Sequence, residues 1–277
     1  MSKKKIKGRK DKKGPKRART ADKHVLYEKS VQNTDLDVGF LEDLFDSNGK
    51  KKPMKLREDF CGTAALVTSW VQSHKDRIAV GLDLDTPTLD WARKHNLSKL
   101  SEAELERATL LEENVMNGPA EDFDAVVGFN FSYCIFKQRT DLVNWMRNAH
   151  KALRKGGGLV LDSNGGSELT VEQTERREVD DFVYCWDQQP YNPISGEAIR
   201  AIHFEFDDGS VLSNAFVYDW RLWSLPELRD CMLEAGFSEV EVYWEGVDKS
   251  GDGNGIFSHR EDVVQELAWI AYMVGWK

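Results

Sequence analysis

Short apolar runs alternate with longer amphipathic segments between residues 55 and 162. Short segments predict buried strands at residues 55–58, 78–82, 109–115, 123–129 and 159–162, the last four of them rich in Val, Leu and Ala. Apolar residues recur at helical spacing in residues 64–74 and 139–153, and Pro87 suits the first turn of a further helix. Strands that alternate with helices predict a parallel sheet with helices on both faces.

The pattern changes after residue 180. Residues 182–186, 199–206 and 211–218 are rich in aromatic and β-branched residues, which predicts three antiparallel strands. We expect this insert, at about residues 180–222, to form a lid. A helix at 225–235 and strands at 239–245 and 269–274 follow, with a glycine-rich loop at 251–255. The glycines of residues 155–158 are expected to end the preceding helix.

Charge divides the chain into two parts. Residues 1–20 hold eleven Lys or Arg and one Asp, although the whole chain has a net charge of −9. Because this stretch has few residues to bury, we predict a disordered basic tail over residues 1–23. The tail could bind RNA or ribosomes or direct nuclear import, or it could only raise solubility. Residues 24–277 form the expected folded domain, which is acidic.

Membrane insertion, secretion, disulfides and metal binding are not expected. No apolar run approaches the roughly 18 residues of a membrane span, and the N-terminus lacks the apolar segment of a signal peptide. The four cysteines are scattered, and the six histidines show no ligand spacing. We therefore expect a cytoplasmic protein, with nuclear import through the basic tail as an alternative.

Residues 56–64, Leu-Arg-Glu-Asp-Phe-Cys-Gly-Thr-Ala, carry the most specific motif. They run from a predicted strand through a turn into a predicted helix, and the next strand ends on Asp83, about 20 residues after the turn. In such a unit the turn lets backbone approach a nucleotide, and the carboxylate accepts hydrogen bonds from ribose hydroxyls. The spacing therefore predicts a nucleotide-binding α/β unit, although Gly-x-Gly-x-x-Gly itself is absent.

These residues resemble motif I and the acidic motif of class I S-adenosylmethionine-dependent methyltransferases, and the resemblance extends from Tyr27 to Val274. It implies a Rossmann-like seven-stranded α/β sheet and S-adenosyl-L-methionine as cofactor. Asp83 would then bind the ribose, and Asn114 and Val115 the adenine. The implied cofactor contacts are Tyr27, Gln32, Arg57, Glu58, Phe60, Cys61, Gly62, Thr63, Asp83, Leu84, Asn114, Val115, Asn130 and Phe131.

Residues 130–133, Asn-Phe-Ser-Tyr, follow the fourth predicted strand and should lie between the sulfonium and the methyl acceptor. They weakly resemble the Asn-Pro-Pro-Tyr of amino-group methyltransferases, but both prolines are absent. In the lid, His203 is the one obvious base, although a histidine inside a strand can equally be a packing residue. The predicted catalytic residues are Asn130, Tyr133, Tyr191 and His203.

The sequence thus predicts a methyltransferase that acts on a small-molecule acceptor. Three alternatives stay open: an RNA methyltransferase, for example of cap guanine N7; a non-catalytic cofactor-binding protein; and a nicotinamide-dependent dehydrogenase. The last suits Asp83 but not Phe60 and Cys61 in the turn. Neither the oligomeric state nor the acceptor atom follows from the residues.

Overall fold

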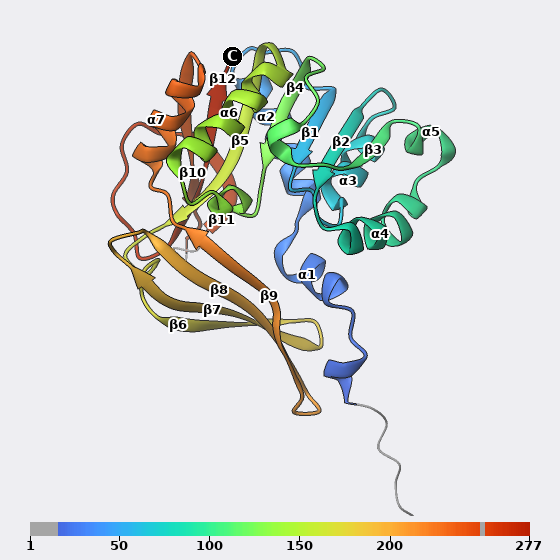
Figure 1. Ribbon diagram of the computed structural model, residues 1–277, viewed down its shortest axis with the longest axis vertical. Helices are drawn as coiled ribbons and strands as arrows, with labels where there is room; N and C mark the ends of the chain where they lie inside the picture. The colour runs from blue at the N-terminus through green and yellow to red at the C-terminus, as the bar shows by residue number, and fades with distance from the viewer. Residues whose placement is uncertain (1–15, 250–252) are drawn as a thin grey trace, which may run out of the picture.

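The computed structural model describes residues 16–249 and 253–277. Its main sheet is built from β1 (Lys55–Asp59), β2 (Ile78–Asp83), β3 (Ala108–Glu112), β4 (Phe123–Gly128), β5 (Leu153–Gly165), β10 (Glu239–Val247), β11 (Gly253–His259) and β12 (Trp269–Trp276). Their order is β11-β10-β12-β5-β4-β1-β2-β3 (Figure 1). β3, β2, β1, β4 and β5 are parallel to one another, whereas β12, β10 and β11 pair antiparallel.

Helices cover both faces of this sheet, so it forms the middle of three layers. The α-helices are α1 (Lys23–Val31), α2 (Thr34–Ser47), α3 (Ala65–Ser73), α4 (Thr86–His95), α5 (Glu102–Leu105), α6 (Arg139–Ala152) and α7 (Leu225–Ala235). Four 3₁₀-helices are η1 (Arg17–Arg19), η2 (Leu97–Lys99), η3 (Val115–Asn117) and η4 (Ser132–Ile135) within the described residues. The predicted α/β class is confirmed.

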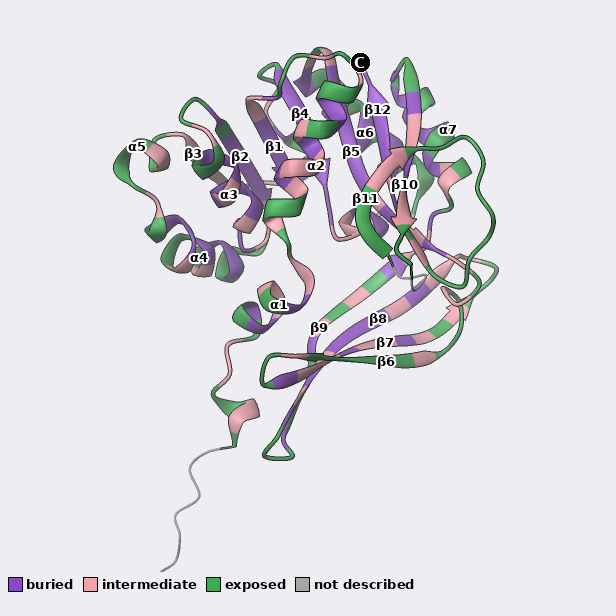
Figure 2. Ribbon diagram, turned by 180° about the vertical axis from the view of Figure 1, so that it is seen from behind, coloured by how far each residue is buried: buried purple, intermediate pink, exposed green. Residues whose placement is uncertain are grey.

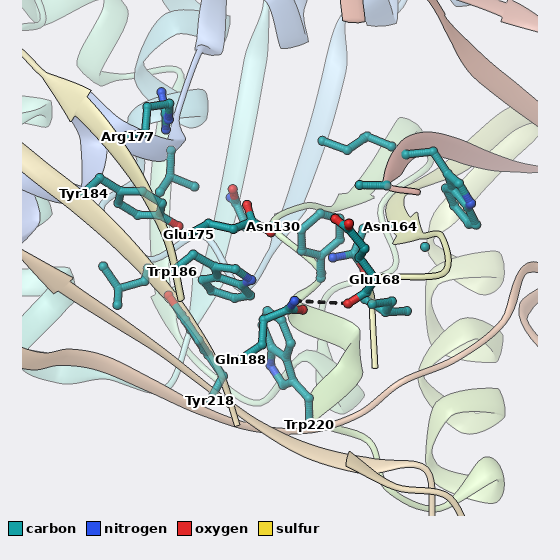
Figure 3. Close-up of a pocket in the computed structure, with 18 of the residues that line it drawn as sticks. Asn130, Asn164, Glu168, Glu175, Arg177, Tyr184, Trp186, Gln188, Tyr218 and Trp220 are labelled. Atoms are coloured by element: carbon teal, nitrogen blue, oxygen red, sulfur yellow. Dashed lines mark hydrogen bonds between the residues drawn. The ribbon is translucent and has the colours of Figure 1, made fainter. Parts of the chain in front are cut away.

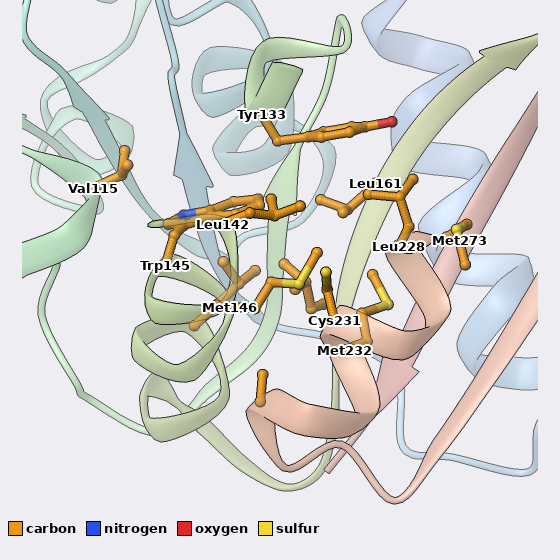
Figure 4. Close-up of a cluster of buried hydrophobic side chains, with 14 of the residues drawn as sticks. Val115, Tyr133, Leu142, Trp145, Met146, Leu161, Leu228, Cys231, Met232 and Met273 are labelled. Atoms are coloured by element: carbon orange, nitrogen blue, oxygen red, sulfur yellow. The ribbon is translucent and has the colours of Figure 1, made fainter. Parts of the chain in front are cut away.

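One apolar core lies on each face of the sheet. On one face, α6 and α7 pack together, and Figure 4 shows Met146 of α6 beside Cys231 and Met232 of α7. On the other face, α2, α3 and α4 supply Leu41, Trp70 and Leu89, each buried. β4 runs between the two cores and is buried at all six positions, as a central parallel strand should be.

The prediction that residues 155–158 end a helix is wrong. Helix α6 ends at Ala152, and the three glycines lie inside β5. A Cβ at Gly157 would lie 2.8 Å from the carbonyl oxygen of Asp124, and one at Gly158 would lie 2.8 Å from the ring of Trp276. The glycines therefore serve close approach of β5 to its neighbours, which local sequence does not reveal. β3 also ends earlier than predicted, so Asn114 follows the strand.

The insert forms a separate antiparallel sheet, which we call the lid. In the described residues it has four strands, β6 (Gln173–Val179), β7 (Phe182–Asn192), β8 (Glu197–Phe206) and β9 (Val211–Arg221), in sequence order. Three strands were predicted; β6 is the addition. Its sequence, Gln-Thr-Glu-Arg-Arg-Glu-Val, is polar and largely exposed (Figure 2). β6 is a strand only because its backbone pairs with β7, so its sequence has no apolar pattern from which a strand could be predicted.

An eighth strand, β11, extends the predicted seven-stranded sheet at one edge. Residues 253–255 were expected in a loop, but they begin β11, which pairs with β10. Residues 250–252 lie outside the described residues, as does most of the predicted tail, residues 1–15. The rest of the predicted tail, residues 16–23, contains η1 and the start of α1. None of the described helices is long and apolar enough to cross a membrane.

Candidate functional site

The turn after β1 has an unusual backbone. Phe60, Gly62 and Ala64 all have positive φ angles, of 61°, 49° and 56°. Left-handed backbone is costly for residues with a Cβ, and such conformations cluster at ligand sites. A Cβ placed on Gly62 would meet no protein atom within 4 Å, so this turn faces open space. The left-handed backbone of this turn therefore costs conformational free energy, and it leaves the backbone at Gly62 uncovered by side chains at the carboxyl end of β1.

Asp83, at the end of β2, holds this turn. Its Oδ2 accepts a hydrogen bond from the Gly62 N–H at 2.8 Å, and its Oδ1 accepts one from the Asp85 N–H at 2.9 Å. A carboxylate has further lone pairs, so Asp83 can still accept from a ligand hydroxyl. Leu84, the next residue, is 64% exposed.

The other turn residues point in different directions. Phe60 packs against the rings of Phe136 and Trp145, at 6.0 and 5.6 Å between centroids. Cys61 is buried beneath Gly81, where a Cβ would approach its sulfur to 2.8 Å. The Thr63 hydroxyl donates to the Gln32 side-chain oxygen at 3.3 Å, which joins the turn to the end of α1. The Cys61 side chain therefore does not face the open space above the turn.

Arg57 lies completely buried in β1. Its Nε and Nη2 donate to the two carboxylate oxygens of Asp59 at 2.7 and 3.0 Å, Nη2 also donates to the Val115 carbonyl at 3.0 Å, and Nη1 donates to the Pro119 carbonyl at 3.1 Å. Every one of these partners is protein. Any influence of Arg57 on a ligand must therefore act through Val115, which it holds in place after β3.

Asn114 and Val115 begin η3 at the carboxyl end of β3. The Asn114 side-chain oxygen accepts from the Met116 N–H at 2.9 Å, and Val115 is buried. Glu58 is also buried, and its Oε2 accepts from the Val67 N–H of α3 at 3.3 Å. Burial, followed by the nearby carboxylate of Asp37, raises the pKa of Glu58 well above its ordinary value.

Asp162, in β5, shapes the loop that follows β4. Its two carboxylate oxygens accept the backbone N–H groups of Asn130 and Phe131 at 2.8 and 3.0 Å, and both residues have positive φ. Burial raises the pKa of Asp162 to about 7. Sequence reasoning missed this residue, whose one signal was an acid at the carboxyl end of a central strand.

Two adjoining cavities open at this edge of the sheet. The larger, about 460 Å³, lies between the main sheet and the lid. Figure 3 shows Trp186, Gln188 and Tyr218 of the lid around it, with Asn130, Asn164 and Glu168 of the main domain. Tyr27 of α1 also lines it. The smaller, about 370 Å³, is lined by Gln32, Asp37, Glu58 and Asp162, and both cavities share Asn130 and Phe131.

Three of the four predicted catalytic residues do not reach these cavities. Tyr133 is buried in the core between the sheet and α6 (Figure 4), and burial raises its pKa. Tyr191 lies near the end of β7, beyond an irregularity in the strand. His203 does not line the larger cavity although Ile202 does, and its Nε2 lies 3.7 Å from Asp187, which sits between the cavity-lining Trp186 and Gln188 and points to the opposite face of the lid. There its Nδ1 accepts from the Asn214 N–H at 2.8 Å.

Asn130 is thus the one predicted catalytic residue at the cavity. No group of three or more His, Cys, Asp or Glu in the described parts of the chain is arranged to hold a metal ion.

Residues 60–157 match a family model described as a methyltransferase domain. The matched segment contains the turn, Asp83, Asn114 and the loop at Asn130. No curated protein matches the chain in sequence.

The fold is shared with solved methyltransferases. A S-adenosylmethionine-dependent methyltransferase from Clostridium acetobutylicum ATCC 824 superposes with a TM-score of 0.66 at 15% identity, covering 91% of this chain and 96% of that one. DesVI from Streptomyces venezuelae gives 0.65 at 20% identity, with 91% and 95% covered. CalS10 from Micromonospora echinaspora, an amino pentose methyltransferase solved with the cofactor, gives 0.62 at 14%, with 90% and 95% covered. The family match covers residues 60–157, and the fold of the chain is that of solved methyltransferases, as predicted.

The residues at the carboxyl ends of β1, β2 and β3 fit S-adenosylmethionine. Gly62 leaves open space, Asp83 offers carboxylate lone pairs to a ribose, and Asn114 and Val115 follow β3 where an adenine would lie. The smaller cavity adjoins this edge, and its oxygen acceptors Asp37, Glu58 and Asp162 suit the ammonium of a methionine end. When bound, this cofactor supplies an electrophilic methyl group.

Proposed function

We propose that the protein transfers a methyl group from S-adenosylmethionine to a small-molecule acceptor bound in the larger cavity. One observation carries the proposal: this cavity adjoins the loop at Asn130 and Phe131 and is roofed by the lid. Its volume lies in the range of small-molecule sites. Enclosure favours such an acceptor because the surrounding walls can hold its reactive atom in line with the methyl group.

The names of several structural neighbours describe enzymes that methylate sugars or natural products. KedS8 is a sugar N-methyltransferase, CalS10 is an amino pentose methyltransferase and MtfA is a glycopeptide N-methyltransferase. Their identity to this chain is low, so they support a small acceptor without identifying it.

Cofactor binding is the first test, and Asp83 is the residue to change. Asp83→Ala removes the acceptor for the ribose and for the Gly62 N–H, so it should weaken S-adenosylhomocysteine binding by about 2–4 kcal/mol, measured by calorimetry. Asp90→Ala, an exposed acid on α4, is the matched control and should leave the affinity unchanged. An Asp83→Ala affinity within twofold of the wild type would reject the role of Asp83. Binding of NAD without S-adenosylhomocysteine would overturn the proposed function.

A further inference from the structure

The walls of the two cavities carry more acidic than basic side chains, although burial raises the pKa of Asp37 and Asp162 to about 7 and that of Glu58 well above its ordinary value, which lowers the negative charge of these three. Among the described residues the walls include one cation, Arg177, and six acids: Asp37, Glu58, Asp162, Glu168, Glu175 and Glu245. The Arg177 guanidinium donates to the Ser30 carbonyl and lies 5.3 Å from the Tyr184 ring centroid, so part of it is engaged with the protein, and the acids outnumber it. An anionic acceptor would therefore meet repulsion on entry.

Two of the acids, Glu168 and Glu175, line only the larger cavity and are thus separate from the acids of the methionine end. Glu175 of β6 stands directly opposite Trp186 of β7 in the antiparallel ladder, and both line the cavity. Directly opposed residues have Cβ atoms about 5 Å apart on the same face. Glu175 and Trp186 thus lie side by side on the cavity face of the lid, and the Glu175 carboxylate also accepts from the Gln173 amide at 3.4 Å.

Aromatic rings extend this wall. Trp186 lies 6.2 Å from Tyr218 and 5.9 Å from Trp220 between ring centroids, and Tyr218 stacks on Trp220 at 4.7 Å. Rings of this kind attract a cation held over their faces. Gln188 adds an acceptor, because its amide hydrogens go to the carbonyls of Glu168 and Val171, which leaves its oxygen for a ligand N–H (Figure 3).

We propose that the methyl acceptor is an amine, which enters the larger cavity as an ammonium ion and is held by Glu175, Glu168 and the Trp186 ring. This rests on the proposed function and names the acceptor class for the same site. Before transfer the ammonium passes one proton to a cavity carboxylate. The nitrogen lone pair then forms a bond to the methyl carbon as the carbon–sulfur bond breaks, and that bond's electrons stay on sulfur as the neutral thioether. The positive charge moves from sulfur to the methylated nitrogen.

An amine also fits what the cavity offers chemically. A hydroxyl acceptor needs a strong base to become nucleophilic, whereas an amine needs only to lose its proton. No His or Lys lines either cavity in the described parts of the chain, and His203 faces away from them. Carboxylates bind an ammonium, and they can relay to solvent the one proton that it must lose.

The test uses the full-length chain saturated with S-adenosylhomocysteine and three probes of matched shape: benzylamine, benzyl alcohol and benzoate. Calorimetry should give benzylamine at least about tenfold tighter binding than benzyl alcohol, with benzoate weakest. Glu175→Gln should weaken benzylamine binding by about fivefold or more. Glu178→Gln makes the same charge change on the opposite face of β6 and should leave the binding within about twofold.

Any of four results would overturn the amine proposal. Benzylamine could bind no more tightly than benzyl alcohol, or less tightly than benzoate. Benzylamine could fail to bind, or Glu175→Gln and Glu178→Gln could weaken its binding equally. The proposed function fails separately, if S-adenosylhomocysteine does not bind. Labelled S-adenosylmethionine incubated with charge-fractionated small metabolites distinguishes the two further. Label in the cationic fraction supports both proposals, label only in neutral or anionic fractions rejects the amine alone, and label in no fraction rejects both.

Discussion

At the scale of the residue, burial decides what an ionisable side chain does. Arg57 belongs to the motif, and the sequence suggested a cofactor contact. In the fold it is fully buried and paired with Asp59, which also accepts from the Trp145 indole N–H at 2.7 Å. Burial raises the pKa of Asp59, and the charge of Arg57 opposes that shift. The pair is therefore a structural unit beneath the site.

Removing one partner of this pair should be costly. Arg57→Met leaves the Asp59 charge buried and the Val115 carbonyl unpaired, so the free energy of unfolding should fall by about 3–5 kcal/mol in urea denaturation. Arg93→Met breaks an exposed pair with Asp90 and should cost less than about 1 kcal/mol. Equal losses would contradict the structural role assigned to Arg57.

At the scale of the element, the turn between β1 and α3 combines strain with exposure. Three of its residues have left-handed backbone, and two of them, Phe60 and Ala64, are not glycine. The flanking elements compensate: Phe60 is packed between rings, and the Cys61 N–H donates to the Leu82 carbonyl at 2.9 Å. A rigid turn can present its backbone to a ligand without reorganising on binding.

Gly62→Val should abolish S-adenosylhomocysteine binding, because its side chain would fill the space left for the ligand. Valine is also strained at positive φ, so a second variant must separate strain from overlap. Gly49 has a φ of 62° and open space around its Cβ, but it follows α2 and lies outside the turn. Gly49→Val should therefore lower the melting temperature to a similar degree while leaving the affinity intact. A folded Gly62→Val protein with normal affinity would show that the turn does not hold the cofactor.

At the scale of the whole molecule, η1 and α1 connect the lid to the main domain. Toward the lid, Arg17 pairs with Asp181 at 2.7 Å and Lys29 with Asp180 at 2.7 Å, and Leu26 packs in the apolar cluster of the lid. Toward the main domain, the Trp91 indole N–H donates to Asp22 at 2.6 Å, and Asn96 donates to Glu28 at 2.7 Å. This segment thus fixes the lid above the cavities.

Asp22→Ala should loosen that connection. Asp22 caps α1 through the His24 N–H and also binds Trp91, so the variant loses two interactions together worth about 2–3 kcal/mol. Relative to the wild type, we expect the variant to show faster amide hydrogen exchange in the lid strands, with a smaller change in β1 and β4. Its melting temperature should also be lower. Asp35→Ala, an exposed acid in the first turn of α2, is the control. Unchanged exchange in the lid of the Asp22 variant would show that α1 does not hold it.

Local pattern determined most of the main domain. Buried parallel strands are nearly continuous apolar runs, and the residues after them necessarily meet at one edge of the sheet. The turn at Gly62, the acid at Asp83 and the loop at Asn130 could therefore be predicted from order along the chain. Polar β6 and the glycines of β5 could not, because pairing and close approach to distant segments decide them.

The lining of the larger cavity was likewise decided by tertiary structure. Successive residues of a lid strand point to opposite faces, so every second residue meets the cavity. Irregularities in the pairing shift this alternation, and they occur between Gln188 and Tyr191 and between Ile202 and Phe204. The resulting arrangement places Trp186 and Glu175 at the cavity and His203 on the opposite face of the lid. Asp162 lies 31 residues from Phe131 in sequence, and only the parallel pairing of β4 with β5 brings the two together. The sequence by itself determined which turn, acid and loop meet at one edge of the sheet, whereas long-range register determined which side chains line the larger cavity.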